Sequence, residues 1–217
     1  MLQPHRQGII SKNLGNDYTM EYSFHAYNSH AENGVATSLN HLLSEKRMGA
    51  GLDLSKNLPV IVCVGSDLVI GDSLGPLTGS MLTFKTQGLG AYIYGTLHAP
   101  ITAKEVKYLK DFLRHTHPHR PIIAVDAAVG KTEDVGIIKV SAQPLAPGSG
   151  ANKKLGSFGD ATVLGVVAEK SLGNYALFNG TRLRLVHSMA DQISEGIATL
   201  LHDCAARAYH SYKNVAR

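Results

Sequence analysis

Two aspartates that follow apolar runs are the residues of this chain best suited to acid–base chemistry. Asp72 lies a few residues after the apolar run Val60–Val64, and Asp126 closes the run Ile122–Val125. A carboxylate beside buried apolar residues is costly to desolvate unless it is paired, hydrogen-bonded or bound to a metal ion. When two such groups share a water, one holds a proton as an acid and the other acts as a base. The structural alternative for each is a helix cap or a turn, which Asp also favours.

A serine hydrolase is a second possibility at the same place. Gly71–Gly75 reads GDSLG, which fits the G-x-S-x-G pattern, and GDSL is itself a serine-esterase signature. A nucleophile elbow joins its strand directly to its helix, whereas Ser66–Ile70 separate this motif from the preceding apolar run. The late D-x-x-H pair of GDSL-type esterases is also missing from the second half of the sequence. The order Ser73, Asp126, His187 still permits a catalytic triad, so serine hydrolysis remains a minor alternative.

Two histidines follow expected strands and offer a metal-dependent alternative. His98 comes after Ala91–Leu97, and His187 comes after a further strand candidate. With Asp72 and Asp126, either histidine would complete an oxygen-rich site with one imidazole, which suits zinc, manganese or nickel. This set predicts a metal-assisted amidase. The paired-acid hypothesis needs no cofactor.

The loop Pro147–Asp160 is rich in glycine and proline and contains Lys153 and Lys154. Backbone N–H groups in such a loop, together with the two lysines, are able to form an anion nest or an oxyanion hole. The alternative is an ordinary surface loop.

Strands and helices alternate along most of the chain. The pattern predicts the strands 60–64, 91–97, 121–125, 136–140 and 161–167, a possible last strand at 182–186, and helices from residue 29, over 74–86, after a capping box at 102–105, and over 188–212. This alternation predicts a three-layer α/β/α sandwich with a mostly parallel sheet, of the phosphorylase/hydrolase-like kind. Such sheets bind ligands beyond the carboxyl ends of their strands.

Residues 1–27 show no sustained periodicity, and the sequence HTHPHR at 115–120 reads as a solvated turn. We therefore expect an N-terminal arm with one helix over residues 1–50 and a single α/β/α domain over residues 51–217.

Bulk composition narrows the class of protein. The 217 residues are 44% hydrophobic and 18% charged, which is typical of a globular chain. The net charge is only +4 and the basic residues are scattered, so nucleic acid is not an expected partner. The first 30 residues lack the apolar segment of a signal peptide, no apolar run is long enough to cross a bilayer, and the two cysteines suggest no disulfide framework. We expect a cytoplasmic protein that does not bind membranes. The long C-terminal helix is compatible with a homodimer.

Three segments resemble a known group of proteins. VGSDLVIGDSLGP (64–76), AVDAAVG (124–130) and PLAPGSGANKKLGSFGD (144–160) are similar to segments of the spore germination protease. They are still more similar to the short YyaC-type sporulation proteins, a domain of unknown function, and more distantly to hydrogenase-maturation endopeptidases. The likeness covers roughly residues 58 to 200.

The resemblance implies specific roles. The functional aspartates of the germination protease, in its D-A-L-G-P and V-D-A segments, correspond to Asp72 and Asp126. Its P-G-S-G-x-x-x-K stretch corresponds to Pro147 and then to the residues Gly148, Ser149, Gly150 and Lys154 or Lys153. The implied function is peptide-bond hydrolysis on a protein or peptide substrate, in the forespore or mother-cell cytoplasm of a spore-forming bacterium. Because this chain is much shorter than the germination protease, an inactive sporulation factor that binds a peptide or protein partner in the same cleft is the main alternative.

Overall fold

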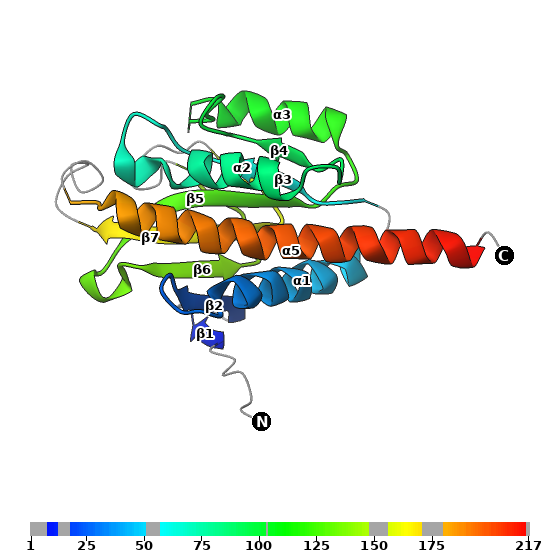
Figure 1. Ribbon diagram of the computed structural model, residues 1–217, viewed down its shortest axis with the longest axis horizontal. Helices are drawn as coiled ribbons and strands as arrows, with labels where there is room; N and C mark the ends of the chain where they lie inside the picture. The colour runs from blue at the N-terminus through cyan, green and yellow to red at the C-terminus, as the bar shows by residue number, and fades with distance from the viewer. Residues whose placement is uncertain are drawn as a thin grey trace.

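The computed structural model describes residues 8–12, 18–50, 57–102, 104–147, 156–170 and 180–215, and the structural statements below concern these residues (Figure 1). One seven-stranded sheet has the order β1-β2-β6-β7-β5-β3-β4. Its strands are β1 Gly8–Lys12, β2 Tyr18–His25, β3 Val60–Cys63, β4 Tyr92–Tyr94, β5 Ile122–Gly130, β6 Ile137–Ser141 and β7 Ala161–Glu169. The helices are α1 Ala31–Ala50, α2 Leu74–Lys85, α3 Val106–Thr116 and α5 Leu183–Val215, with short 3-10 turns η1 Ile70–Asp72 and η2 Thr132–Asp134.

The sheet has a parallel half and an antiparallel half. Strands β7, β5, β3 and β4 run parallel to one another, as the alternation of strands and helices predicts. Strands β6, β2 and β1 are added antiparallel beside β7. Because β3, β5 and β7 are parallel, their carboxyl ends meet at one edge, and the loop between β3 and α2 lies at this edge.

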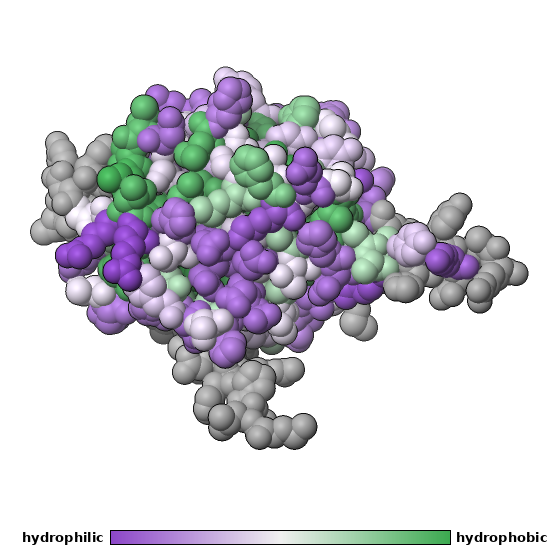
Figure 2. Space-filling view, viewed as in Figure 1, coloured by the Kyte–Doolittle hydropathy of each residue, from purple (hydrophilic) through white to green (hydrophobic). Residues whose placement is uncertain are grey.

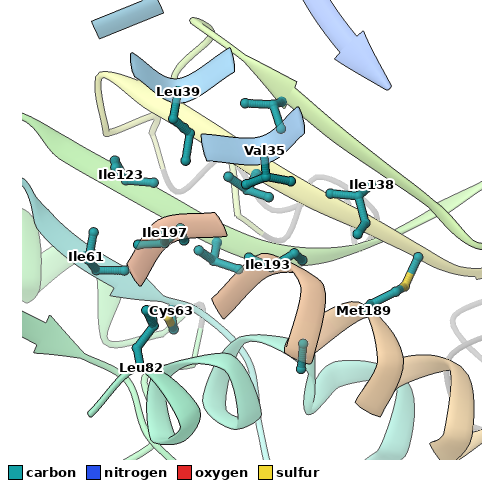
Figure 3. Close-up of a cluster of buried hydrophobic side chains, with 14 of the residues drawn as sticks. Val35, Leu39, Ile61, Cys63, Leu82, Ile123, Ile138, Met189, Ile193 and Ile197 are labelled. Carbon is teal, nitrogen blue, oxygen red and sulfur yellow. The ribbon is translucent and has the colours of Figure 1, made fainter. Parts of the chain in front are cut away.

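Helices cover both faces of the sheet. On one face, α1, α2 and α5 pack on the strands, and Figure 3 shows Ile197 of α5 beside Ile61 and Ile123 of the sheet. On the other face, Val106 and other side chains of α3 pack against β3 and β5. The expected α/β/α sandwich is therefore confirmed. None of the helices in the described part of the chain has both the length and the apolar character needed to span a membrane.

The irregular arm expected over residues 1–27 is wrong at two places. Gly8–Lys12 and Tyr18–His25 form strands, and β2 pairs with β6 from Glu21↔Ser141 to His25↔Ile137. Tyr18, Met20, Tyr22 and Phe24 alternate with polar residues, which is the period of a strand with one buried face. Three of these side chains, those of Met20, Tyr22 and Phe24, pack against the main core. Residues before Gly51 thus contribute to the same sheet and core as the rest of the chain.

The possible strand at 182–186 is also wrong, because α5 begins at Leu183. The alternation in RLRLV resembles a strand, but Val186 continues into a helical series of buried residues, Met189, Ala190, Ile193 and Ile197. Their spacing of three and four residues keeps one face of α5 on the core, and this long-range packing decides the local structure.

Helix α2 lies unusually close to the sheet. A Cβ atom added to Gly75 would lie 2.0 Å from the carbonyl oxygen of Val64, so only glycine allows this approach. Gly75 is in the first turn of α2, three residues after Asp72. The contact therefore fixes the position of the loop end that carries Asp72.

Candidate functional site

Hydrogen bonds lock the loop that carries Asp72. The Ser66 N–H donates to the Asp72 carbonyl at 3.0 Å, and the Asp72 N–H donates to the Val69 carbonyl at 3.0 Å. Gly65 turns the chain out of the sheet with φ +145°, and a Cβ atom there would lie 2.1 Å from the Asp72 carbonyl oxygen. The two ends of the loop thus meet at the end of β3, and the backbone of Asp72 is held in place.

Asp126 lies within β5 rather than at its end, because β5 continues to Gly130. Its neighbour Val125 pairs with Cys63, the last residue of β3, and accepts a hydrogen bond from the Val64 N–H at 2.8 Å. Asp126 is therefore the first residue of β5 beyond the end of β3. On its other side it pairs with Leu164 of β7. The carboxyl group is partly buried, and its Oδ1 accepts a hydrogen bond from the Ala127 N–H at 2.8 Å.

The negative charge of Asp72 affects the acidity of Asp126. Burial, with a further contribution from the negative charge of Asp72, raises the pKa of Asp126 well above its usual range, and the hydrogen bond from Ala127 offsets only part of this. Burial also raises the pKa of Asp72, against a hydrogen bond from the Ser66 N–H that lowers it. A proton therefore binds preferentially at Asp126 while Asp72 ionises more readily. Two neighbouring carboxyl groups with separated proton affinities are suited to act as acid and base.

Ser73 takes part in local structure. Its hydroxyl is buried and donates to the Ile70 carbonyl at 2.8 Å, which supports η1. Among the described residues, no histidine forms a hydrogen bond with this hydroxyl. A nucleophilic serine would need such a base, so the geometry favours Asp72 over its neighbour.

The two histidines proposed as ligands lie on exposed surface. His187 lines a small cavity of about 250 Å³ between the turn after β2 and the first turns of α5, together with Tyr27 and Asp191. His98 is exposed in the loop after β4. Within the described ranges, no three His, Cys, Asp or Glu side chains are grouped so that they could hold a metal ion. The structure therefore does not assemble the ligand set of Asp72, Asp126 and a histidine.

The HTHPHR segment is not the solvated turn expected from its sequence. His117 is buried at the end of α3 and forms a 2.8 Å hydrogen bond with the Tyr94 hydroxyl of β4. Burial, together with the nearby charge of Arg120, lowers the pKa of His117. Its neighbours His115 and His119 are exposed. His117 has a structural role at the opposite edge of the sheet from the carboxyl pair.

The proposed anion-binding residues Gly148, Ser149, Gly150, Lys153 and Lys154 lie outside the described residues. The segments on either side of them are joined by two hydrogen bonds. The Leu145 N–H donates to the Phe158 carbonyl at 2.8 Å, and the Phe158 N–H donates back at 3.0 Å. The roles of these residues remain predictions.

The sequence interpretation missed two residues that support the site. Gly65 and Ser66 hold the ends of the Asp72 loop together. The Gly-Ser pair directly after a buried strand is a turn signal, but it does not reveal which later residue closes the turn.

Comparison with known proteins places most of this chain in one family. The model of a family described as "Protein of unknown function (DUF1256)" matches residues 25–196. A protein of Bacillus subtilis (strain 168), named "Uncharacterized protein YyaC", is 35% identical over 173 residues, which are 79% of this chain and 82% of that protein. Asp72 and Asp126 both lie within the matched segment.

Proposed function

The chain belongs to the DUF1256 family, and we propose that it hydrolyses peptide bonds with Asp72 and Asp126 as its acid–base pair. The observation that carries the proposal is the pair itself. One carboxyl group raises the pKa of the other where the parallel strands end, and this edge is where such sheets place their chemistry.

The two aspartates have different roles in this mechanism. Asp126, the group with the more strongly raised pKa, is protonated and donates to the oxygen of the scissile carbonyl. Ionised Asp72 takes a proton from a water as the water oxygen attacks the carbonyl carbon. When the C–N bond breaks, the proton held by Asp72 passes to the leaving nitrogen, and the oxygen returns its proton to Asp126. The pair is thus restored.

The choice of peptide bonds over other substrates rests on the sequence resemblance. The segments around Asp72 and Asp126 resemble those that carry the functional aspartates of the spore germination protease. By the same resemblance, we place the activity in the cytoplasm of a sporulating cell.

The proposal is tested with four purified full-length chains: wild type, Asp72→Asn, Asp126→Asn and Asp67→Asn. Asp67 is the matched control because it is an exposed aspartate in the same loop. Each chain is incubated with a peptide library from a digested proteome between pH 4 and 8, and new termini are counted by mass spectrometry. Removal of either member of the pair should reduce cleavage by about 10²-fold or more, and the control should match wild type.

Two outcomes would overturn the proposal. Cleavage that survives in both Asn variants would show that the pair is not catalytic. Absence of cleavage by wild type at every pH would favour the inactive binding factor. A chelator separates the metal-dependent alternative, because the paired-acid mechanism predicts unchanged cleavage in its presence.

A further inference from the structure

Large aliphatic side chains project into solvent from the loop that carries Asp72. Leu68 exposes 87% of its surface and Ile70 exposes 47%. Leu97, in the loop after β4, exposes 42%. We call these three residues the apolar rim. In Figure 2, hydrophobic residues gather at the end of the molecule where Figure 1 draws the loop between β3 and α2.

The two loops of the apolar rim are neighbours. The Gly65 N–H donates to the Ile101 carbonyl at 2.8 Å, and Val64 forms a parallel bridge with Ile101. The N–H of Leu97 is in turn held by the Ser80 hydroxyl of α2 at 2.9 Å. The rim is thus built on the same strand ends as the carboxyl pair.

The backbone of Leu68 is tied to the residue that closes the Asp72 loop. The Leu68 N–H donates to the Ser66 hydroxyl at 3.2 Å, and the Ser66 N–H bonds the Asp72 carbonyl. The loop therefore presents an apolar side chain to solvent four residues from a candidate catalytic group.

We propose that the apolar rim binds large apolar side chains of an extended polypeptide whose scissile bond lies at Asp72 and Asp126. This inference rests on the proposed function and adds a substrate class to it. An extended chain advances about 3.3 Å per residue with alternating side chains, so residues within a few positions of the scissile bond reach the rim. Folded proteins bury such side chains. The expected substrates are thus unfolded or flexible segments with aliphatic or aromatic residues beside the cleaved bond.

Binding is separated from cleavage by working in an Asp126→Asn background. An array of immobilised overlapping peptides is probed with this chain and with versions that add Leu68→Ser, Ile70→Ser or Phe84→Ser. Phe84 is the matched control because it exposes 80% of its surface near the other end of α2. It lies ten residues beyond Leu74, or roughly 15 Å along the helix axis.

Peptides that bind the parent chain should be enriched in large apolar residues. Leu68→Ser and Ile70→Ser should each weaken their binding by about tenfold, which is the scale of losing one buried aliphatic contact, and Phe84→Ser should leave it unchanged. Equal binding by the rim variants and the parent, or equal loss in the Phe84 control, would overturn the inference. So would an array that binds nothing while Leu68→Ser dissociates a dimer in sedimentation, because the rim would then join two copies of this chain.

The outcomes also separate this inference from the proposed function. If peptide binding depends on the rim but cleavage survives the loss of both aspartates, the acid–base pair is refuted and the rim is not. If cleavage depends on the aspartates but shows no preference for apolar sites and is unchanged by Leu68→Ser, the rim is refuted and the acid–base pair is not.

Discussion

Replacing Gly75 with alanine should destabilise the protein, although alanine is the better helix former. Alanine gains about 1 kcal/mol over glycine inside a helix. The new Cβ atom, however, would lie 2.0 Å from the Val64 carbonyl oxygen and 2.8 Å from its carbonyl carbon. Real Cβ contacts almost never fall below 3.0 Å, so helix and strand must separate by at least 1.0 Å (3.0 − 2.0). The neighbouring atoms belong to backbone, and no side-chain rotation relieves the contact.

Overpacking of this kind costs up to about 3 kcal/mol, so the net loss in the free energy of unfolding should be about 2 kcal/mol after the gain in helix propensity. For a chain of this size, that loss lowers Tm by roughly 4–8 °C. The displacement also moves Asp72, three residues earlier in the chain. A shift of about 1 Å at a catalytic group can reduce turnover about 10²-fold, so cleavage should fall further than stability alone explains.

Urea unfolding followed by circular dichroism measures the change, with Gly180→Ala as the matched control. A Cβ atom at Gly180 has nothing within 4 Å, so this variant should stay within about 0.5 kcal/mol of wild type. If Gly75→Ala unfolds at the same urea concentration as wild type or a higher one, α2 does not approach β3 closely enough for a side chain at this position to clash.

Three further expectations concern buried titratable groups. Because the pKa of Asp126 is raised in the folded state, ionised Asp126 destabilises the protein. Asp126→Asn should therefore be more stable than wild type at pH 7.5. In urea unfolding, this difference in stability should shrink as pH falls toward 5. For His117, stability changes with pH in the opposite direction, because its pKa is lowered in the folded state and the unfolded chain binds the proton more readily. Wild type should therefore lose stability as pH falls below about 6.5. His117→Gln should lose less stability than wild type between pH 8 and 5.5. Cys63 and Cys204 are both buried, and burial raises the pKa of the Cys63 thiol. Both thiols should therefore react with a thiol reagent only as fast as the protein unfolds. Rapid labelling of the native protein would contradict their burial.

The parallel half of the sheet is predictable from sequence because its strands are short apolar runs. Val60–Val64 and Ile123–Val125 are buried, which is typical of strands covered on both faces and distinguishes these runs from the helices between them. The topology rule then places Asp72 and Asp126 at one edge. Strand pattern and topology therefore give a short set of candidates at this edge, and the sequence resemblance selects these two aspartates from it.

Other features depend on partners that local sequence does not reveal. The strand Tyr18–His25 exists because β6 pairs with it, and a single alternating segment does not identify such a partner. The RLRLV segment at 182–186 alternates like a strand, yet packing of the rest of α5 makes it helical. His117 is buried because the end of α3 lies against Tyr94, a residue 23 positions earlier in the sequence.

The perturbed acidity of Asp126 arises from a difference in length between neighbouring strands. Strand β3 stops at Cys63 while β5 continues to Gly130, so the loop that leaves β3 comes to lie beside Asp126. That loop supplies the negative charge of Asp72 as well. Burial is the larger cause of the raised pKa of Asp126 and the charge of Asp72 the smaller one.

Asp72→Asn should therefore lower the pKa of Asp126 without returning it to its usual value, because the asparagine removes the charge and keeps the loop in place. Carboxyl-carbon NMR titration of Asp126 in wild type and Asp72→Asn measures this directly, with Asp67→Asn as the control for loss of an exposed charge in the same loop. An unchanged titration of Asp126 in Asp72→Asn would show that the two carboxyl groups do not interact, and a paired-acid mechanism would then have no physical basis.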